Sequence, residues 1–223
     1  MTKKTFLGAM AVVTAVALTG GALVASNMGF KLNYTLSQAP SGIDGTNVLG
    51  LPDNRQTGLT DAKALMDDIG FAQTINVSRF LKTGPGAGGF QVYTGRKGGG
   101  LAFPLAAGEG YYARMLTSVN YVIVGSDDPA IAYALAQAPS GIDGTNFYAY
   151  NYHQTAADAK ALMDDVGFAQ TINVSRFLAT GPGAGGFQVY TGRKGGGLAF
   201  PLTPGQAYYV RMLTTVNYAP SHY

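Results

Sequence analysis

Two histidines and three adjacent pairs of aspartates are the side chains of this chain best suited to catalysis or metal binding. The aspartate pairs at residues 67–68 and 164–165 fall in helical patterns, where neighbouring side chains point about 100° apart. Such carboxylates do not converge on one substrate atom, as a glycosidase pair must. His153 and His222 lie outside any H-E-x-x-H or histidine-rich spacing. We therefore expect no catalytic residues and no zinc site, and we interpret the protein as a non-enzyme.

The remaining acidic and glycine-rich stretches do not match known cation or phosphate sites. The pair at residues 127–128, with Asp44 and Asp143 in two IDGT turns, offers carboxylate oxygens for calcium. The D-x-[DN]-x-[DN]-G spacing of a calcium loop is nevertheless absent. The strings GPGAGG and GRKGGGL lack the lysine-hydroxyl pair and the following helix of a phosphate-binding loop. We interpret them as tight β-turns and expect no metal and no cofactor.

Aromatic residues are the best candidates for contact with a partner. Within residues 147–154, FYAYNYHQ, Tyr148 and Tyr150 should enter the core, because leucines occupy the related positions 49 and 51. Phe147 and Tyr152 should then be exposed, where aromatic rings commonly contact sugars or proteins. The plainer interpretation is that these aromatic residues pack within the protein. For the charged residues at the loop tips, the plainer interpretation is that water solvates them. The candidate contacts for a partner or a glycan are Phe147, Tyr152, His153, Arg96, Lys97, Arg193 and Lys194.

These candidates lie on a sequence that is written twice. Residues 83–105 return letter for letter at 180–202, and residues 61–105 match 158–202 at all but two positions. The differing pairs are Ile69/Val166 and Lys82/Ala179. We expect a tandem duplication, with a leader at residues 1–25, a first β unit at 26–125, a hinge at 126–129 and a second β unit at 130–223.

The pattern within each copy predicts a mainly β unit. A helix is expected at residues 61–69, capped by Thr60 and ended by Gly70, because apolar residues recur at i, i+3, i+4 and i+7. Strands of the first copy are expected at residues 30–38, 48–51, 74–81, 90–94, 101–105, 111–116 and 119–124. About seven short strands with one helix indicate a small β-sandwich or a barrel. In the second copy, Pro220 should blunt the last strand.

The start of the chain indicates export. Residues 1–4 are basic and residues 6–25 carry no charge, which is the pattern of a secretory signal peptide or, if uncleaved, of a membrane anchor. The chain has no cysteine, so its fold rests on packing without disulfides. Without the two lysines of the leader, 13 Lys and Arg face 12 Asp and Glu, which gives no case for nucleic acid. Asn33, Asn76 and Asn173 each begin an N-x-Ser/Thr glycosylation triplet.

Several short motifs resemble a recurring small β-module of secreted and surface-exposed bacterial proteins. They are TNVLGLP, VSRF, FQVYTGR, FPLAAGEGYYARM and VNYVIVG. The resemblance covers residues 47–125 and 146–218. It departs where no tryptophan follows Asn47 and where Ala207 replaces the closing glycine of GEGYY. It implies a β fold and a location outside the cell, and it implies no activity.

The sequence thus leads to three hypotheses about function, and the duplication supports the first, because two weak contacts can bind far more tightly together than singly. The first is an exported, non-enzymatic structural or adhesive protein of the cell surface, the extracellular matrix or a filament, which associates with itself or with other surface proteins. Its sharper form is strand exchange with a neighbouring molecule. The strand-exchange segment follows the leader directly and presents Phe30, Leu32, Tyr34 and Leu36. The second hypothesis is a pair of carbohydrate-binding domains that use Phe147, Tyr152 and loop tyrosines. The third is an enzyme of unrecognised type.

Overall fold

The computed structural model describes residues 29–38, 46–95, 99–138, 146–179, 183–192 and 196–222, and these are mainly β. The first copy of the repeated sequence forms β1 (Phe30–Leu36), β2 (Thr46–Gly50), β3 (Asn54–Arg55), α2 (Ala62–Ile69), β4 (Thr74–Phe80), β5 (Phe90–Tyr93), β6 (Gly110–Met115) and β7 (Val119–Ser126). The second copy forms β8 (Tyr133–Leu135), β9 (Asn146–Ala149), α3 (Ala159–Val166), β10 (Thr171–Phe177), β11 (Phe187–Tyr190), β12 (Ala207–Met212) and β13 (Val216–Tyr218).

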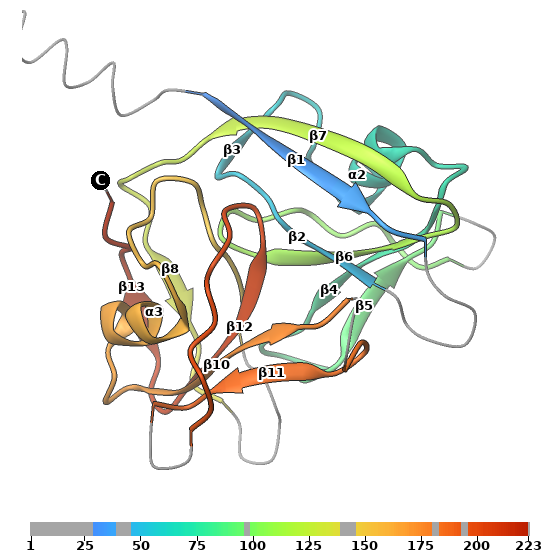
Figure 1. The fold of residues 1–223 in the computed structure, drawn as a ribbon. Helices are drawn as coiled ribbons and strands as arrows, with labels where there is room; N and C mark the ends of the chain where they lie inside the picture. The colour runs from blue at the N-terminus through green and yellow to red at the C-terminus, as the bar shows by residue number, and fades with distance from the viewer. Residues whose placement is uncertain are drawn as a thin grey trace, which may run out of the picture.

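The strands form four antiparallel sheets, two in each copy. The first copy, blue to green in Figure 1, has the sheets β2-β6-β4-β5 and β1-β7-β3. The second copy, yellow to red, has the sheets β11-β10-β12-β9 and β13-β8. The repeated sequence also repeats its register, since Val77 faces Tyr93 in the first copy and Val174 faces Tyr190 in the second.

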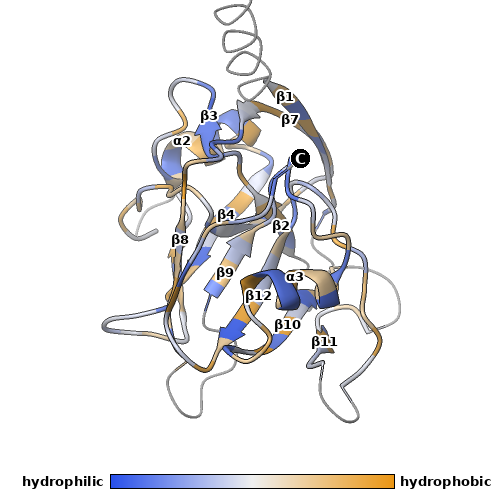
Figure 2. Cartoon of the chain, turned by 90° about the vertical axis from the view of Figure 1, so that its left-hand side faces the viewer, coloured by the Kyte–Doolittle hydropathy of each residue, from blue (hydrophilic) through white to orange (hydrophobic). Residues whose placement is uncertain are grey.

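Both helices begin and end in the same way. The side chain of Asp61 accepts a hydrogen bond from the Ala64 N–H at 2.8 Å, so Asp61 is the N-cap and the prediction of Thr60 was wrong by one residue. Gly70 ends the helix with φ 125°, which confirms the predicted stop. Figure 2 shows that each helix carries both polar and apolar faces. The buried stripe of α2 is Ala62, Leu65, Met66 and Ile69.

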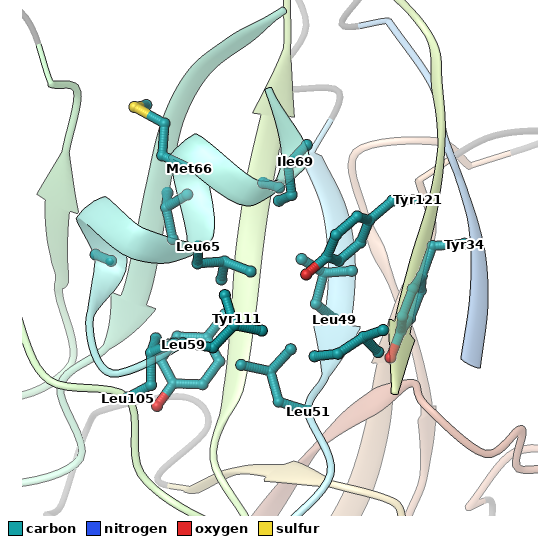
Figure 3. Packing of buried hydrophobic residues seen from close by; sticks show 14 of the residues in the cluster. Tyr34, Leu49, Leu51, Leu59, Leu65, Met66, Ile69, Leu105, Tyr111 and Tyr121 are labelled. Carbon is teal, nitrogen blue, oxygen red and sulfur yellow. The ribbon is translucent and has the colours of Figure 1, made fainter. Parts of the chain in front are cut away.

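The core of the first copy lies between α2, the four-stranded sheet and the β1–β7 pair. Figure 3 shows Leu65 and Ile69 of α2 on one side of this core and Tyr34 and Tyr121 on the other. The second copy builds a corresponding core around α3. Tyr148 and Tyr150 are buried, as are the leucines at positions 49 and 51, which confirms the prediction that these positions point inward.

The structure corrects the sequence-based strands at two places. Residues 101–105 do not form a strand, because their backbone bonds to the start of the helix. The carbonyl of Phe103 accepts from the Ala62 N–H at 2.9 Å, and the Leu105 N–H donates to the Thr60 carbonyl at 3.0 Å. The short strand β3 was not predicted. The blunted final strand is confirmed, since β13 has three residues where β7 has eight.

The segment proposed for strand exchange pairs within its own chain. β1 runs antiparallel to β7 from Phe30 opposite Gly125 to Leu36 opposite Val119. Its alternation places Leu32, Tyr34 and Leu36 in the core. β1 is the outer strand of its sheet. In this structure the segment is therefore already paired, and exchange would require it to leave β7. The leader lies outside the described residues, and none of the helices they form could span a bilayer.

Candidate ligand-binding site

The outer faces of the two four-stranded sheets pack against each other. β6 and β12, which lie side by side, are buried on both faces (Figure 1). Tyr111 of β6 enters its own core, whereas the next residue, Tyr112, points to the other copy. The contact is a mainly aromatic hydrophobic cluster. It consists of Val48, Tyr112, Phe147, Ala207 and Tyr209, and Phe80 and Phe177 pack against it.

A stack of three rings forms the centre of this contact. The ring of Phe147 stacks on Tyr112 at a centroid distance of 4.7 Å and on Tyr209 at 4.5 Å. The Tyr112 hydroxyl donates to the Tyr209 hydroxyl at 3.0 Å. Burial raises the pKa of Tyr209 to about 12 and that of Tyr112 further still. Both phenols are therefore neutral at physiological pH, and the contact carries no charge.

Contacts around the stack are reciprocal. The Phe80 ring of the first copy meets the Tyr209 ring edge-on at 5.3 Å, and Phe177 of the second copy meets Tyr112 at 5.6 Å. The backbone repeats this relation: the Gly50 N–H donates to the Gly205 carbonyl at 2.6 Å, and the N–H of residue 149 donates to the carbonyl of residue 108 at 3.0 Å. Reciprocal contacts between equivalent residues are the mark of a twofold arrangement.

Two grooves flank the aromatic contact. The β10 groove has a volume of about 340 Å³, and the β4 groove has a volume of about 330 Å³. The β10 groove is lined by Asn173, Ser175, Val189 and Tyr209 of the second copy's sheet, together with Phe187 and with Phe80, Gly88 and Phe90 of the first copy. The β4 groove is lined by the equivalents Asn76, Ser78, Val92 and Tyr112, with Phe90, Arg114 and, from the second copy, Phe177, Gly185 and Phe187.

The grooves combine exposed aromatic rings with unused hydrogen-bonding groups. Phe90 and Phe187 each line both grooves and are 49% and 51% exposed. Within the part of the chain that the structure describes, the side chains of four further lining residues make no hydrogen bond or ion pair. They are Asn76, Ser78, Asn173 and Ser175. Each amide can donate two hydrogen bonds and accept two, and each hydroxyl can do both. The grooves can therefore bind an uncharged, polyhydroxylated ligand that also has an apolar face.

The predicted contact residues are not gathered at these grooves. Phe147 is 5% exposed, so the prediction that it faces solvent was wrong: the sheet of the first copy covers it. Tyr152 is 44% exposed, stacks on Phe30 of β1 at 5.2 Å and meets the His153 ring edge-on. It lies in a different cluster from Phe147. The four loop-tip residues, Arg96, Lys97, Arg193 and Lys194, lie outside the described residues.

His153 belongs to a polar junction at the hinge. Its backbone N–H donates to the carboxylate of Asp127 at 2.8 Å, and its Nδ1 lies 3.2 Å from the same oxygen. Nearby, Asp53 accepts hydrogen bonds from the Tyr133 hydroxyl at 2.8 Å and from the Asp128 N–H at 3.2 Å. Burial raises the pKa of both carboxyl groups, Asp53 and Asp127. The junction ties the loop after β2 to the hinge and to the second copy.

The paired aspartates of the helices have structural partners. In α2, Asp67 pairs with Lys63 at 2.5 Å, while Asp68 accepts a hydrogen bond from the Tyr121 hydroxyl at 2.8 Å. The equivalent residues of α3 make the same contacts. Asp68 thus fixes the helix to β7, a role that the sequence did not reveal. Across the described ranges, no group of three or more His, Cys, Asp or Glu is placed to hold a metal ion.

The groove residues were not identified from the sequence, although it contained a signal for them. Asn76, Ser78 and Phe80 alternate along β4 with the buried Val77, so they share the outer face of the sheet. What period-two alternation does not show is that a second sheet meets this face and makes grooves of it. In comparisons with known proteins, no family model, no curated protein and no solved structure matches the chain.

Proposed function

We propose that this protein is an exported, non-enzymatic adhesive protein that binds glycans through the β4 and β10 grooves. In this proposal its two units arose by tandem duplication, each is a small β-sandwich, and each supplies the floor of one groove. The observation that carries the proposal is the pairing of half-exposed phenylalanines with amides and hydroxyls that have no hydrogen-bond partner among the described residues. The leader-like start of the chain supports a place at the cell surface or in the extracellular matrix.

The chemistry of the grooves favours a neutral sugar over other small ligands. A pyranose ring presents C–H groups on one face, which pack on an aromatic ring, and hydroxyls at its rim, which bond to amides. Of the described residues, none that lines the β10 groove is charged, and Arg114 is the one charged residue that lines the β4 groove. A phosphorylated or strongly acidic ligand would need more cationic groups than this. Volumes of about 340 and 330 Å³ are at the small end for ligand pockets, which fits one or two sugar rings.

Binding arrays of immobilised neutral glycans provide the test. The mature protein should bind a subset of them, and Asn76→Ala/Asn173→Ala should lose that binding because the floor amide is removed from both grooves. The matched control is Asn120→Ala/Asn217→Ala, which removes two exposed asparagines at equivalent positions of β7 and β13. The control should bind like the wild type. Equal binding by the groove variant and the wild type would contradict the proposal.

A structural role through strand exchange is the second candidate. It is favoured by β1, which is an outer strand and lies next to the leader. A neighbour's equivalent strand would replace β1 beside β7. Deletion of residues 26–37 should then abolish assembly of the mature protein, as measured by sedimentation. Assemblies of unchanged size after the deletion would rule this role out.

A further inference from the structure

We infer that one molecule holds two separate glycan chains, one in each groove, and so acts as a cross-linker. This inference rests on the proposed function, because it concerns the same two grooves. It goes beyond that function by stating that two ligands bind to one molecule and that their binding cross-links them. It is carried by the reciprocal construction of the grooves and by the polarity of a sugar chain.

The two grooves are the same site built twice with the roles of the copies exchanged. In the β10 groove the second copy supplies the polar floor, with Asn173, and the first copy supplies the wall, with Phe80. In the β4 groove the first copy supplies the floor, with Asn76, and the second supplies the wall, with Phe177. Such an exchange is what a twofold axis between the grooves produces.

A glycan chain has two different ends, so a groove with fixed polar and aromatic groups binds it in one direction. If the twofold axis runs across the grooves, the two grooves bind a chain in opposite directions. A single chain that passed through both would therefore lie in the wrong direction in the second groove. If the axis runs along the grooves, they lie side by side and a single chain would have to turn back. Phe90 and Phe187 line both grooves, so the two sites share a boundary, and a single chain would have to reverse its direction at these two rings. In either arrangement, two chains are needed to occupy both grooves alike.

The presence of two grooves also affects how strongly the protein binds to a matrix. Each groove is small and engages a short piece of chain, so a single site should bind weakly. In a matrix that offers many copies of the same chain, the second groove captures a neighbouring chain at high local concentration. The molecule then joins two chains without any change of shape. This gives the duplicated sequence a role that one copy does not fulfil.

Titration calorimetry with soluble neutral hexasaccharides of glucose, N-acetylglucosamine, xylose and mannose tests the number of chains. The wild-type mature protein should bind two equivalents of the hexasaccharide it recognises. Asn173→Ala/Ser175→Ala, which changes only the floor of the β10 groove, should bind one equivalent with an unchanged dissociation constant. Asn76→Ala/Ser78→Ala should do the same through the β10 groove alone. Circular dichroism spectra should match the wild type, because these changes only shorten side chains.

The same variants should separate binding from cross-linking. Light scattering of the corresponding soluble polysaccharide should rise on addition of wild-type protein and should stay at baseline with either single-groove variant. A stoichiometry of one, with all binding lost in each single-groove variant, would overturn the inference and leave the proposed function standing, because one chain would then cross both grooves. Cross-linking by a single-groove variant would also overturn it. Absence of wild-type binding to every hexasaccharide would refute both.

Discussion

Gly110 of β6 lies directly against the methyl group of Ala207 of β12, within the contact between the two copies. A Cβ atom at position 110 would overlap the Ala207 Cβ and lie 2.9 Å from the ring of Phe147. The two positions are equivalent in the repeat and face each other, so methyl groups at both would overlap. The replacement of glycine by Ala207 in the second copy is thus a feature of the contact between the copies.

The variant Gly110→Ala should destabilise the protein. The added methyl must displace Ala207 or the Phe147 ring, and overpacking of this kind costs about 1–3 kcal/mol in the free energy of unfolding. Chemical denaturation of the protein measures the loss. Adding Ala207→Gly to the same chain should recover part of it, because one of the two opposing atoms is then removed. A Gly110→Ala protein as stable as the wild type would show that the copies do not approach here.

The hydroxyl pair of Tyr112 and Tyr209 should be coupled in a double-mutant cycle. Tyr112→Phe leaves the buried Tyr209 hydroxyl without its partner, and Tyr209→Phe does the reverse, at a cost of about 1–3 kcal/mol each. The double variant removes both hydroxyls, so it should cost less than the sum of the single changes. Denaturation midpoints of the four proteins measure the difference. Additive losses would indicate that the hydroxyls do not bond to each other.

Stability should fall with rising pH because of the buried carboxyl groups at the hinge. Burial raises the pKa of Asp53 and Asp127 in the folded protein above the ordinary value of 3.8. The folded state then binds protons more tightly than the unfolded state, so the free energy of unfolding decreases as pH rises from about 4 through the raised pKa values. Asp53→Asn should flatten this decrease, and adding Asp127→Asn should flatten it further. Urea denaturation between pH 4 and pH 7 checks the slopes, and identical slopes in wild type and variants would contradict this assignment.

The secondary structure was largely predictable because most elements carry their own local signal. The buried residues of β1 alternate, and those of α2 recur with helical spacing, so neither element depends on distant contacts for its pattern. Residues 101–105 look like a strand for the same reason. They were predicted wrongly because their partners are the backbone groups of Thr60 and Ala62, which no pattern within the segment reveals.

The site was not predictable, because it depends on how one copy meets the other. The sequence shows that Lys82 is replaced by Ala179, and only the structure shows why: Lys82 Nζ lies 3.5 Å from the Glu109 carboxylate, which becomes Gln206 in the second copy. Phe147 was expected at the surface because of the alternation of side chains along its own strand. Alternation identified its face of the strand correctly, yet a second sheet covers that face.

The most direct test of the account is the affinity of the two grooves for a glycan when their shared aromatic wall is removed. Phe90→Ala/Phe187→Ala truncates two half-exposed rings, so the fold should persist while the stacking surface is lost. The matched control is Leu101→Ala/Leu198→Ala, which truncates apolar side chains that are 85% and 84% exposed and line neither groove.

Titration of the hexasaccharide bound by the wild type should show a dissociation constant about 5-fold to 140-fold higher for the phenylalanine variant, since each groove loses two ring contacts and each is worth about 0.5–1.5 kcal/mol. The leucine variant should bind like the wild type. An unchanged dissociation constant in the phenylalanine variant would contradict the assignment of the grooves as the glycan-binding site.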